Sequence, residues 1–144
     1  MLISTKGRYA LRVLIDLAEH QTPGDYIPLK EVAQRQDISE KYLESIIKLL
    51  VKDGILTGLR GKGGGYRMSN PPDFYTVGRV LRLTEDSLAP VSCLEPGAKP
   101  CEKMADCRTL SLWQGLDKVI NDYLDKVTIA DLMQSEHAGD YYVI

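Results

Sequence analysis

The feature that most constrains the fold is a glycine-rich run between two short apolar stretches. The run Arg60-Gly-Lys-Gly-Gly-Gly65 separates residues 55–59 (Ile-Leu-Thr-Gly-Leu) from residues 66–68 (Tyr-Arg-Met). Two short strand-forming stretches joined by glycines predict an antiparallel hairpin, because glycine accepts the backbone angles of a tight reversal. The run lacks the Gly-Lys-Ser/Thr ending that opens a helix, which argues against a phosphate-binding loop. We therefore expect a flexible hairpin with basic residues at its tip.

Helical patterns precede this hairpin. Apolar residues recur at helical spacing from Ala10 to Ala18, after Ser4 or Thr5 as a cap, and Pro28 suits the first turn of a short second helix. After a turn at residues 37–39, a third helix is expected over residues 40–52.

The third helix has clear end signals. Ser39 is a good N-cap and Gly54 a natural C-terminal stop, while Leu43, Ile46, Ile47 and Leu50 form its buried face. Helix, short helix, tight turn, helix and hairpin is the order of a winged helix-turn-helix. The helix after the turn, here residues 40–52, is the one that enters the DNA major groove in this motif.

A longer amphipathic helix is expected near the end of the chain. This helix is expected over residues 109–127, after the cysteines. Thr76 caps an earlier helix, and a short helix starts at Thr128. Leu112, Val119 and Leu124 widen the apolar stripe of the longer helix beyond the needs of one small domain. This width favours a dimer helix, with an intramolecular core as the alternative.

The expected fold class is mainly α with a small β-hairpin wing, a winged helix-turn-helix domain plus a long dimerisation helix. We divide the chain into a DNA-binding domain (1–84), a cysteine loop (85–108), and a dimerisation helix with C-terminal tail (109–144).

Charge is unevenly distributed along the chain. Residues 1–68 carry 11 Lys and Arg against 8 Asp and Glu, whereas residues 69–144 carry 7 against 12. A locally basic segment on a mildly acidic protein fits a DNA-reading face, and an ordinary solvated surface is the alternative.

All three cysteines, Cys93, Cys101 and Cys107, fall in one Pro- and Gly-containing stretch with the spacing C-x7-C-x5-C. Thiolates that converge in a loop suit a soft metal, and an odd count cannot be used up by disulfides. An iron–sulfur cluster is the leading interpretation, ahead of zinc and of a redox or bystander role.

Several function classes are disfavoured. No Ser/His/Asp arrangement, paired carboxylates or nucleotide loop supports an enzyme. The start of the chain has too short an apolar run for a signal peptide or membrane span, so the cytoplasm is expected, where thiols stay reduced.

Five sequence features together resemble one family. They are Ser4-Thr-Lys-Gly-Arg-Tyr-Ala10, Ile38-Ser-Glu-Lys-Tyr-Leu-Glu44, Leu59-Arg-Gly-Lys-Gly-Gly-Gly-Tyr66, the cysteine stretch and Leu112-Trp113. The chain resembles the Rrf-type winged-helix transcriptional regulators, closest in type to the iron–sulfur cluster regulator IscR. The resemblance implies a homodimer that binds a double-stranded DNA operator according to the state of a cluster of the [2Fe–2S] type.

The resemblance and the basic wing together give the expected DNA-binding residues. These are Lys6, Arg8, Tyr9, Ser39, Lys41, Tyr42, Glu44, Ser45, Lys48, Arg60, Gly61 and Lys62. In related proteins the residue matching Glu44 discriminates between operator classes. Ser45 departs from the Gln that is common there.

The fourth cluster ligand is left unassigned. The resemblance places a His where this chain has Leu110, which cannot bind iron. Oxygen candidates near the cysteines are Asp106, Glu102, Glu95, Thr109 and Ser111, with water or a small thiol as alternatives.

Two other functions stay open. The ending Tyr141-Tyr-Val-Ile144 resembles family members that regulate cysteine metabolism through a partner enzyme, in which case the cysteines would be thiol sensors. A cluster scaffold or electron carrier is a third function, against which the basic hairpin argues.

Overall fold

The computed structural model describes residues 1–133, so the ending with Tyr141 and Tyr142 lies outside the described residues. The elements, in chain order, are α1 (Thr5–His20), α2 (Leu29–Gln36), α3 (Glu40–Lys52), β1 (Leu56–Leu59), β2 (Gly65–Met68), η1 (Pro72–Phe74), α4 (Val77–Thr84), η2 (Ser92–Leu94), η3 (Met104–Asp106), α5 (Leu110–Lys126) and α6 (Ile129–Met133). The fold is mainly helical with one antiparallel hairpin, as predicted.

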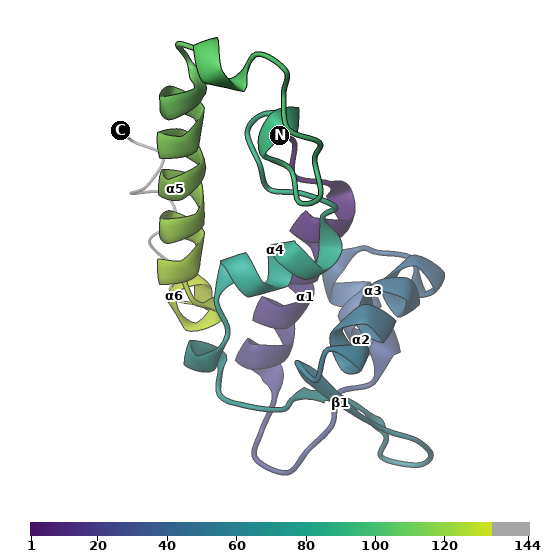
Figure 1. Cartoon of the computed structure of the whole chain (residues 1–144). Coiled ribbons are helices and arrows are strands. Elements are labelled where there is room, and N and C mark those ends of the chain that lie inside the picture. Colours follow the sequence, from purple (N-terminus) through teal and green to yellow (C-terminus); the bar gives the residue numbers. More distant parts are fainter. Residues whose placement is uncertain (134–144) are drawn as a thin grey trace.

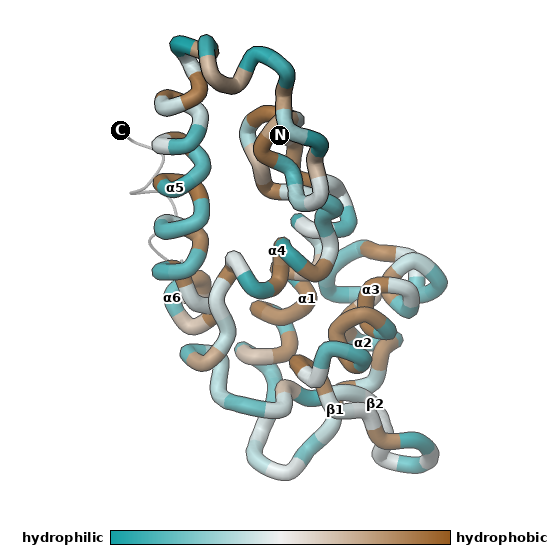
Figure 2. The backbone as a smooth tube through the Cα atoms, viewed as in Figure 1, coloured by the Kyte–Doolittle hydropathy of each residue, from teal (hydrophilic) through white to brown (hydrophobic). Residues whose placement is uncertain are grey.

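Helix α1 lies at the centre and packs against α2, α3, α4, α6 and β2 (Figure 1). Ser4 caps it, as expected, by accepting the amide proton of Gly7. Its apolar stripe is inaccessible to solvent, and burial of each Val or Leu side chain contributes about 1.5–3 kcal/mol. The stripe consists of Ala10, Val13, Leu14 and Leu17. Figure 2 shows the same concentration of hydrophobic residues where α1 meets α2 and α3.

One buried carboxylate fastens α2 to α1. Asp16 is 2% exposed and accepts hydrogen bonds from Arg35 Nη2 at 2.7 Å and from Gln36 Nε2 at 2.8 Å. Burial opposes its ionisation, but these hydrogen bonds outweigh burial and hold the pKa of Asp16 below its ordinary value. The ion pair therefore persists at neutral pH and is lost only as the pH falls through that lowered pKa.

The turn between α2 and α3 closes as predicted. Asp37 ends α2 in the left-handed region with φ 53°, and the amide of Ile38 donates to the carbonyl of Ala33 at 3.1 Å. Ser39 then caps α3 by accepting the amide proton of Tyr42 at 3.2 Å. This three-residue turn fixes the angle at which α3 leaves α2.

The hairpin pairs Leu56 with Met68 and Leu59 with Gly65. Ile27 adds a further rung, because it exchanges two backbone hydrogen bonds with Tyr66. A Cβ at Gly65 would clash with the carbonyl of Ile27, so this rung requires glycine there. The first strand begins one residue later than predicted, since the amide of Ile55 donates to the carbonyl of Leu50 in α3 at 2.9 Å.

The C-terminal end of α5 returns to the helical core. The amide of Val77 donates to the carbonyl of Val127 at 2.8 Å, and that of Ile129 donates to the carbonyl of Tyr75 at 3.0 Å. Ile129, the first residue of α6, is fully buried in the same cluster as α1. The division at residues 84 and 108 stays a prediction. Among residues 1–133 no helix has the length and hydrophobicity needed to cross a membrane.

We expect Arg35→Met to lower the free energy of unfolding by about 3 kcal/mol, because it leaves the buried Asp16 carboxylate without its cation. Urea denaturation at pH 7 measures this loss. The matched control is Glu31→Gln, which removes the exposed partner of the same arginine at 3.6 Å and should cost less than about 0.5 kcal/mol. Equal losses in the two variants would contradict the assigned role of Asp16.

Candidate functional site

Helix α3 presents one polar face to solvent. Its apolar residues Leu43, Ile46, Ile47 and Leu50 are buried, as predicted. All the candidate residues on and before this helix are exposed, because the helical period places them opposite the buried stripe. They are Ser39, Lys41, Tyr42, Glu44, Ser45 and Lys48. The structure thus brings this part of the predicted set together.

The side chain of Tyr42 packs against α1. The rings of Tyr9 and Tyr42 meet edge to face with centroids 5.9 Å apart, and the guanidinium of Arg12 lies 4.9 Å from the Tyr9 centroid. Arg12 also donates to the Gln36 carbonyl at 2.5 Å, so one array joins three helices. The structure therefore gives Tyr9 a packing role beside Tyr42. Arg8, one turn before Arg12 on α1, is exposed, and Lys6 is half-buried.

The hairpin β1–β2 with its tip at residues 60–64, here called the wing, exposes Arg60, Gly61 and Lys62. Gly61 has φ 92°, and its carbonyl accepts the amide proton of Gly64 at 2.9 Å. A Cβ at Gly64 would clash with the Leu59 carbonyl. The fold of the tip is therefore enough to require these glycines. That they also let the backbone approach DNA closely stays a prediction.

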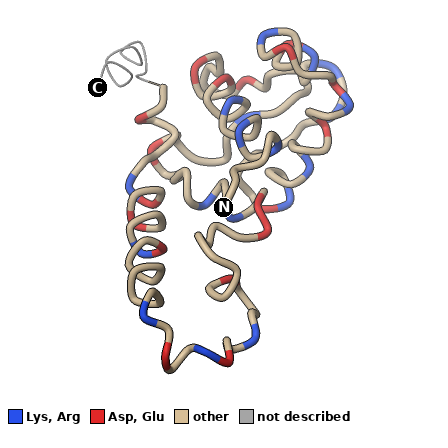
Figure 3. Tube along the Cα trace, turned by 90° about the horizontal axis from the view of Figure 1, so that it is seen from above, with Lys and Arg blue, Asp and Glu red and all other residues tan. Residues whose placement is uncertain are grey.

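A groove of about 750 Å³ separates α3 from the wing. The basic residues that line it are Lys48 and Lys52 from the helix and Arg60 from the wing. The acidic Glu44 lines it as well. Lys52 belongs to the basic segment of the sequence but is not among the expected DNA-binding residues, although it follows Lys48 by one helical turn and so shares its face. Figure 3 shows acidic and basic residues interspersed over the molecule, so the groove gains its positive character locally.

The cysteine segment (residues 85–109) joins α4 to α5 as a long excursion (Figure 1). Cys93 lies in η2 and is half-buried, whereas Cys101 and Cys107 are exposed, and all are free thiols. Within residues 1–133 no three His, Cys, Asp or Glu residues gather as a metal-binding group. The thiols suit iron–sulfur chemistry in kind, but their arrangement in one protomer does not fit a finished cluster site.

Cys107 lies just before α5. Its sulfur is 3.6 Å from Thr109 Oγ1, and hydrogen bonding by the Thr109 hydroxyl, with backbone hydrogen bonds of Thr109 and Leu110, lowers the pKa of this thiol. Leu110 is the first residue of α5, at the position where the resemblance expects an imidazole. Cys107 is thus an exposed thiol with increased thiolate character.

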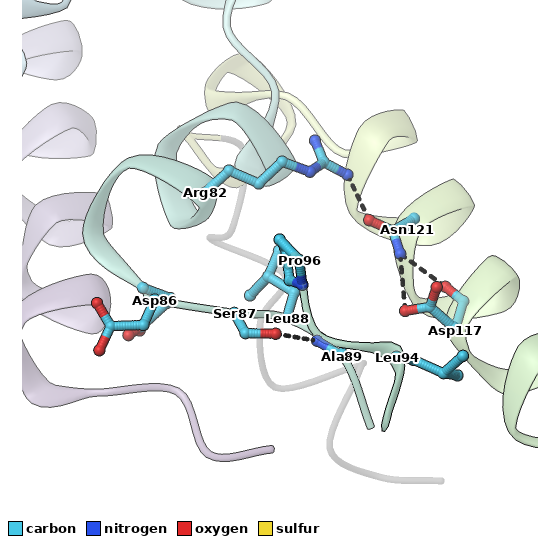
Figure 4. Close-up of a pocket in the computed structure, with 10 residues that line it drawn as sticks. Arg82, Asp86, Ser87, Leu88, Ala89, Leu94, Pro96, Asp117 and Asn121 are labelled. Carbon is cyan, nitrogen blue, oxygen red and sulfur yellow. Dashed lines mark hydrogen bonds between the residues drawn. The ribbon is translucent and has the colours of Figure 1, made fainter. Parts of the chain in front are cut away.

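The start of the cysteine segment packs between α4 and α5. Leu88, Leu94 and Pro96 line a pocket of about 330 Å³ there (Figure 4). Beside it, Arg82 of α4 donates to Asn121 and Asp125 of α5, each at 2.7 Å. This contact ties the second half of α5 to α4.

Helix α5 exposes an apolar face along most of its length. Four large side chains with 40–65% exposure lie at helical spacing, and Figure 2 shows hydrophobic positions interrupting the polar ones along this helix. They are Leu112, Leu116, Val119 and Tyr123. A contiguous exposed apolar stripe of this kind is typical of a protein interface.

Comparisons with known proteins agree with this geometry. Residues 3–135 match a family described as Rrf2, iron-dependent transcriptional regulator. The transcriptional regulator IscR of Erwinia tasmaniensis is 35% identical over 136 residues, covering 94% of this chain and 81% of that protein. Among solved structures, CymR, the global cysteine regulator of B. subtilis, has a TM-score of 0.75 and 33% identity, covering 94% of this chain and 98% of that one. T. potens IscR has a TM-score of 0.70 and 32% identity, with 94% and 88% covered.

We expect Lys52→Gln to weaken DNA binding and to lower the slope of log affinity against log salt by about 1 per subunit, because a phosphate contact is lost. Fluorescence anisotropy on an operator duplex at several salt concentrations measures both quantities. The control is Lys103→Gln, the same change of charge in the cysteine segment, which should leave the slope unchanged. An unchanged slope in Lys52→Gln would remove Lys52 from the interface.

Proposed function

The chain belongs to the Rrf2 family of transcriptional regulators, and we propose that it is a homodimeric operator-binding regulator that senses iron–sulfur status through Cys93, Cys101 and Cys107. Genes of iron–sulfur cluster biogenesis are the proposed targets. The observation that carries the DNA-binding part is the exposed N-terminal face of α3 beside the groove and the wing.

In the proposed complex, the N-terminal turns of α3 enter the major groove. Ser39, Tyr42 and Ser45 then face base edges, and the free amides at the helix start favour phosphate. Glu44 repels phosphate and accepts a hydrogen bond from a cytosine amino group, so it selects sequence at a cost in affinity.

The groove beside α3 suits the DNA backbone. Lys48, Lys52 and Arg60 line it together with one carboxylate, Glu44, so a phosphate strand seated there meets three cations and one anion. Arg60 and Lys62 at the wing tip reach the adjacent minor groove. These contacts position the protein without reading sequence, whereas the α3 contacts specify it.

The exposed face of α5 supports a homodimer. In this proposal Leu112, Leu116, Val119 and Tyr123 pack against the same residues of a second copy. A two-fold dimer presents two α3 helices to two half-sites, so the operator is palindromic.

The cysteine segment is the proposed sensor. Its three thiols are the residue type that binds iron–sulfur clusters, and family relatives include IscR proteins. Since one protomer leaves the thiols apart, loading requires the segment to change shape, and this gives a cluster a route to alter the rest of the protein. The fourth ligand stays unassigned.

A second candidate function is regulation of cysteine or sulfur metabolism. Two observations favour it: the likeness to CymR, and the exposed Cys107 with its lowered pKa. In that function the thiols act directly, or a protein partner carries the signal, and no cluster is needed.

We expect anaerobic reconstitution with iron and sulfide to give coloured protein whose operator affinity differs from that of the apo-protein by at least about tenfold. Absorbance spectra and anisotropy titrations measure the two effects. Leu110→His should slow cluster loss, because imidazole is a better iron ligand than water.

The control is the triple replacement of Cys93, Cys101 and Cys107 by Ala, which should stay colourless and unresponsive. Colourless wild-type protein that contains zinc would overturn the cluster proposal. Unchanged regulation in the triple variant would favour a partner protein.

We expect Val119→Glu to weaken dimerisation by at least about tenfold, because it places a charge in the centre of the apolar face. Sedimentation velocity across a range of concentrations gives the dimer dissociation constant. Lys118→Ala, one residue away and 76% exposed in its side chain, is the control and should behave as wild type. A wild-type monomer at concentrations where the operator is bound would overturn the dimer proposal.

A further inference from the structure

The first turn of α1 is bonded directly to the first residue of the cysteine segment. Glu85 Oε1 accepts hydrogen bonds from the Ser4 amide at 2.7 Å and from Ser4 Oγ at 2.9 Å. Ser4 Oγ in turn accepts the amide proton of Gly7 at 3.0 Å. One side chain therefore links residue 85 to the cap of the helix that lies 81 positions earlier in the sequence.

The packing around this link leaves little freedom. A Cβ at Gly7 would clash with Glu85 Oε1 and would lie 3.0 Å from Thr84 Oγ1, so the helix start fits against the end of α4 only because residue 7 is glycine. Leu88 of the cysteine segment is buried in a cluster that Ile3 also contacts. The N-terminus and the start of the segment thus share both a polar and an apolar contact.

The charge of Glu85 suits its place. A carboxylate at a helix N-terminus interacts favourably with the positive end of the helix dipole and with free amides. Charge-assisted hydrogen bonds of this kind are about twice as strong as neutral ones. The link is therefore a charge-assisted contact between the cysteine segment and the start of α1.

The same turn of α1 belongs to the proposed DNA face. Lys6 and Arg8 follow Ser4 within one turn, and Tyr9 braces Tyr42 on α3. We propose that Glu85 is a positioning residue that transmits the state of the cysteine segment to the DNA-facing start of α1. This inference rests on the proposed DNA-binding role of that turn, but not on the presence of a cluster.

The direction of the effect follows from the geometry. When the segment shifts, Glu85 is withdrawn, Ser4 loses the two hydrogen bonds that it donates to Glu85, and the cap of α1 loosens. Lys6 and Arg8 then lose their fixed positions, while the core of the domain, which is built around residues 10–17, stays folded. DNA affinity therefore changes without unfolding.

The test uses alkylation of the three cysteines with N-ethylmaleimide to perturb the segment in the full-length protein. Amide hydrogen exchange of residues 4–8, measured by mass spectrometry, reports on the cap, since Gly7 and Arg8 donate to Ser4. We expect alkylation to speed this exchange about tenfold in the wild type and to change operator affinity about fivefold or more.

Glu85→Ala should show fast exchange of residues 4–8 before alkylation and less than about a twofold further change after it. Glu85→Gln keeps an oxygen acceptor for both Ser4 donors and should restore most of the wild-type response. Asp86→Ala removes the neighbouring exposed carboxylate and is the matched control. Thermal unfolding of each variant establishes that the domain is folded.

The proposal is overturned if alkylation leaves residues 4–8 unchanged in the wild type, or if Glu85→Ala responds to alkylation as strongly as the wild type. Failure of the proposed function reads out separately. If the untreated wild type does not bind the operator, the DNA-binding role is refuted. If the protein does not acquire colour on reconstitution, the cluster is refuted. In both cases the exchange data still decide the role of Glu85.

Discussion

The rest of the structure depends on the burial of α1 on several sides at once. Its apolar stripe contacts the helix-turn-helix, the hairpin and α4, so these elements keep fixed positions relative to one another. Apolar burial supplies most of the stabilisation but little directional preference. The buried Asp16, with its hydrogen bonds from Arg35 and Gln36, adds direction by fixing the end of α2 against α1.

That rigidity matters in the proposed function, in which α3 reads DNA through residues that contribute little to the core. The exposed face of α3 is positioned by its own buried stripe, by the cap at Ser39 and by Tyr9 beneath Tyr42. The wing is positioned by the extra rung at Ile27. A binding surface built on firmly packed elements loses less freedom when it meets a partner, and this favours affinity.

The cysteine segment is built in the opposite way. Leu88 is the only buried residue between positions 85 and 109. A segment with so few buried contacts opens at a low cost in free energy, whereas the core opens only with global unfolding. In the proposed function, the residues that respond to a signal are therefore separated from the residues that hold their geometry, and Glu85 lies where the two regions meet.

Sequence by itself determined the order of the elements, because end signals are local. Ser4, Ser39 and Thr76 cap their helices as predicted, and the glycine run forms the hairpin tip. Periodicity also identified the buried face of α3. It could not divide the apolar residues of α5 between α4 and solvent, since that division depends on which neighbour is present.

Only the tertiary structure decided the contacts between distant positions. It brought Glu85 to Ser4, returned Ile129 to the core and placed Lys52 in the groove beside Arg60. Within residues 1–133 it also does not bring Cys93, Cys101 and Cys107 together as a metal-binding group, although their close spacing in the sequence suggested convergence. The physical reason is that local signals fix backbone conformation within a turn or two, whereas long-range placement follows from how whole helices bury their faces.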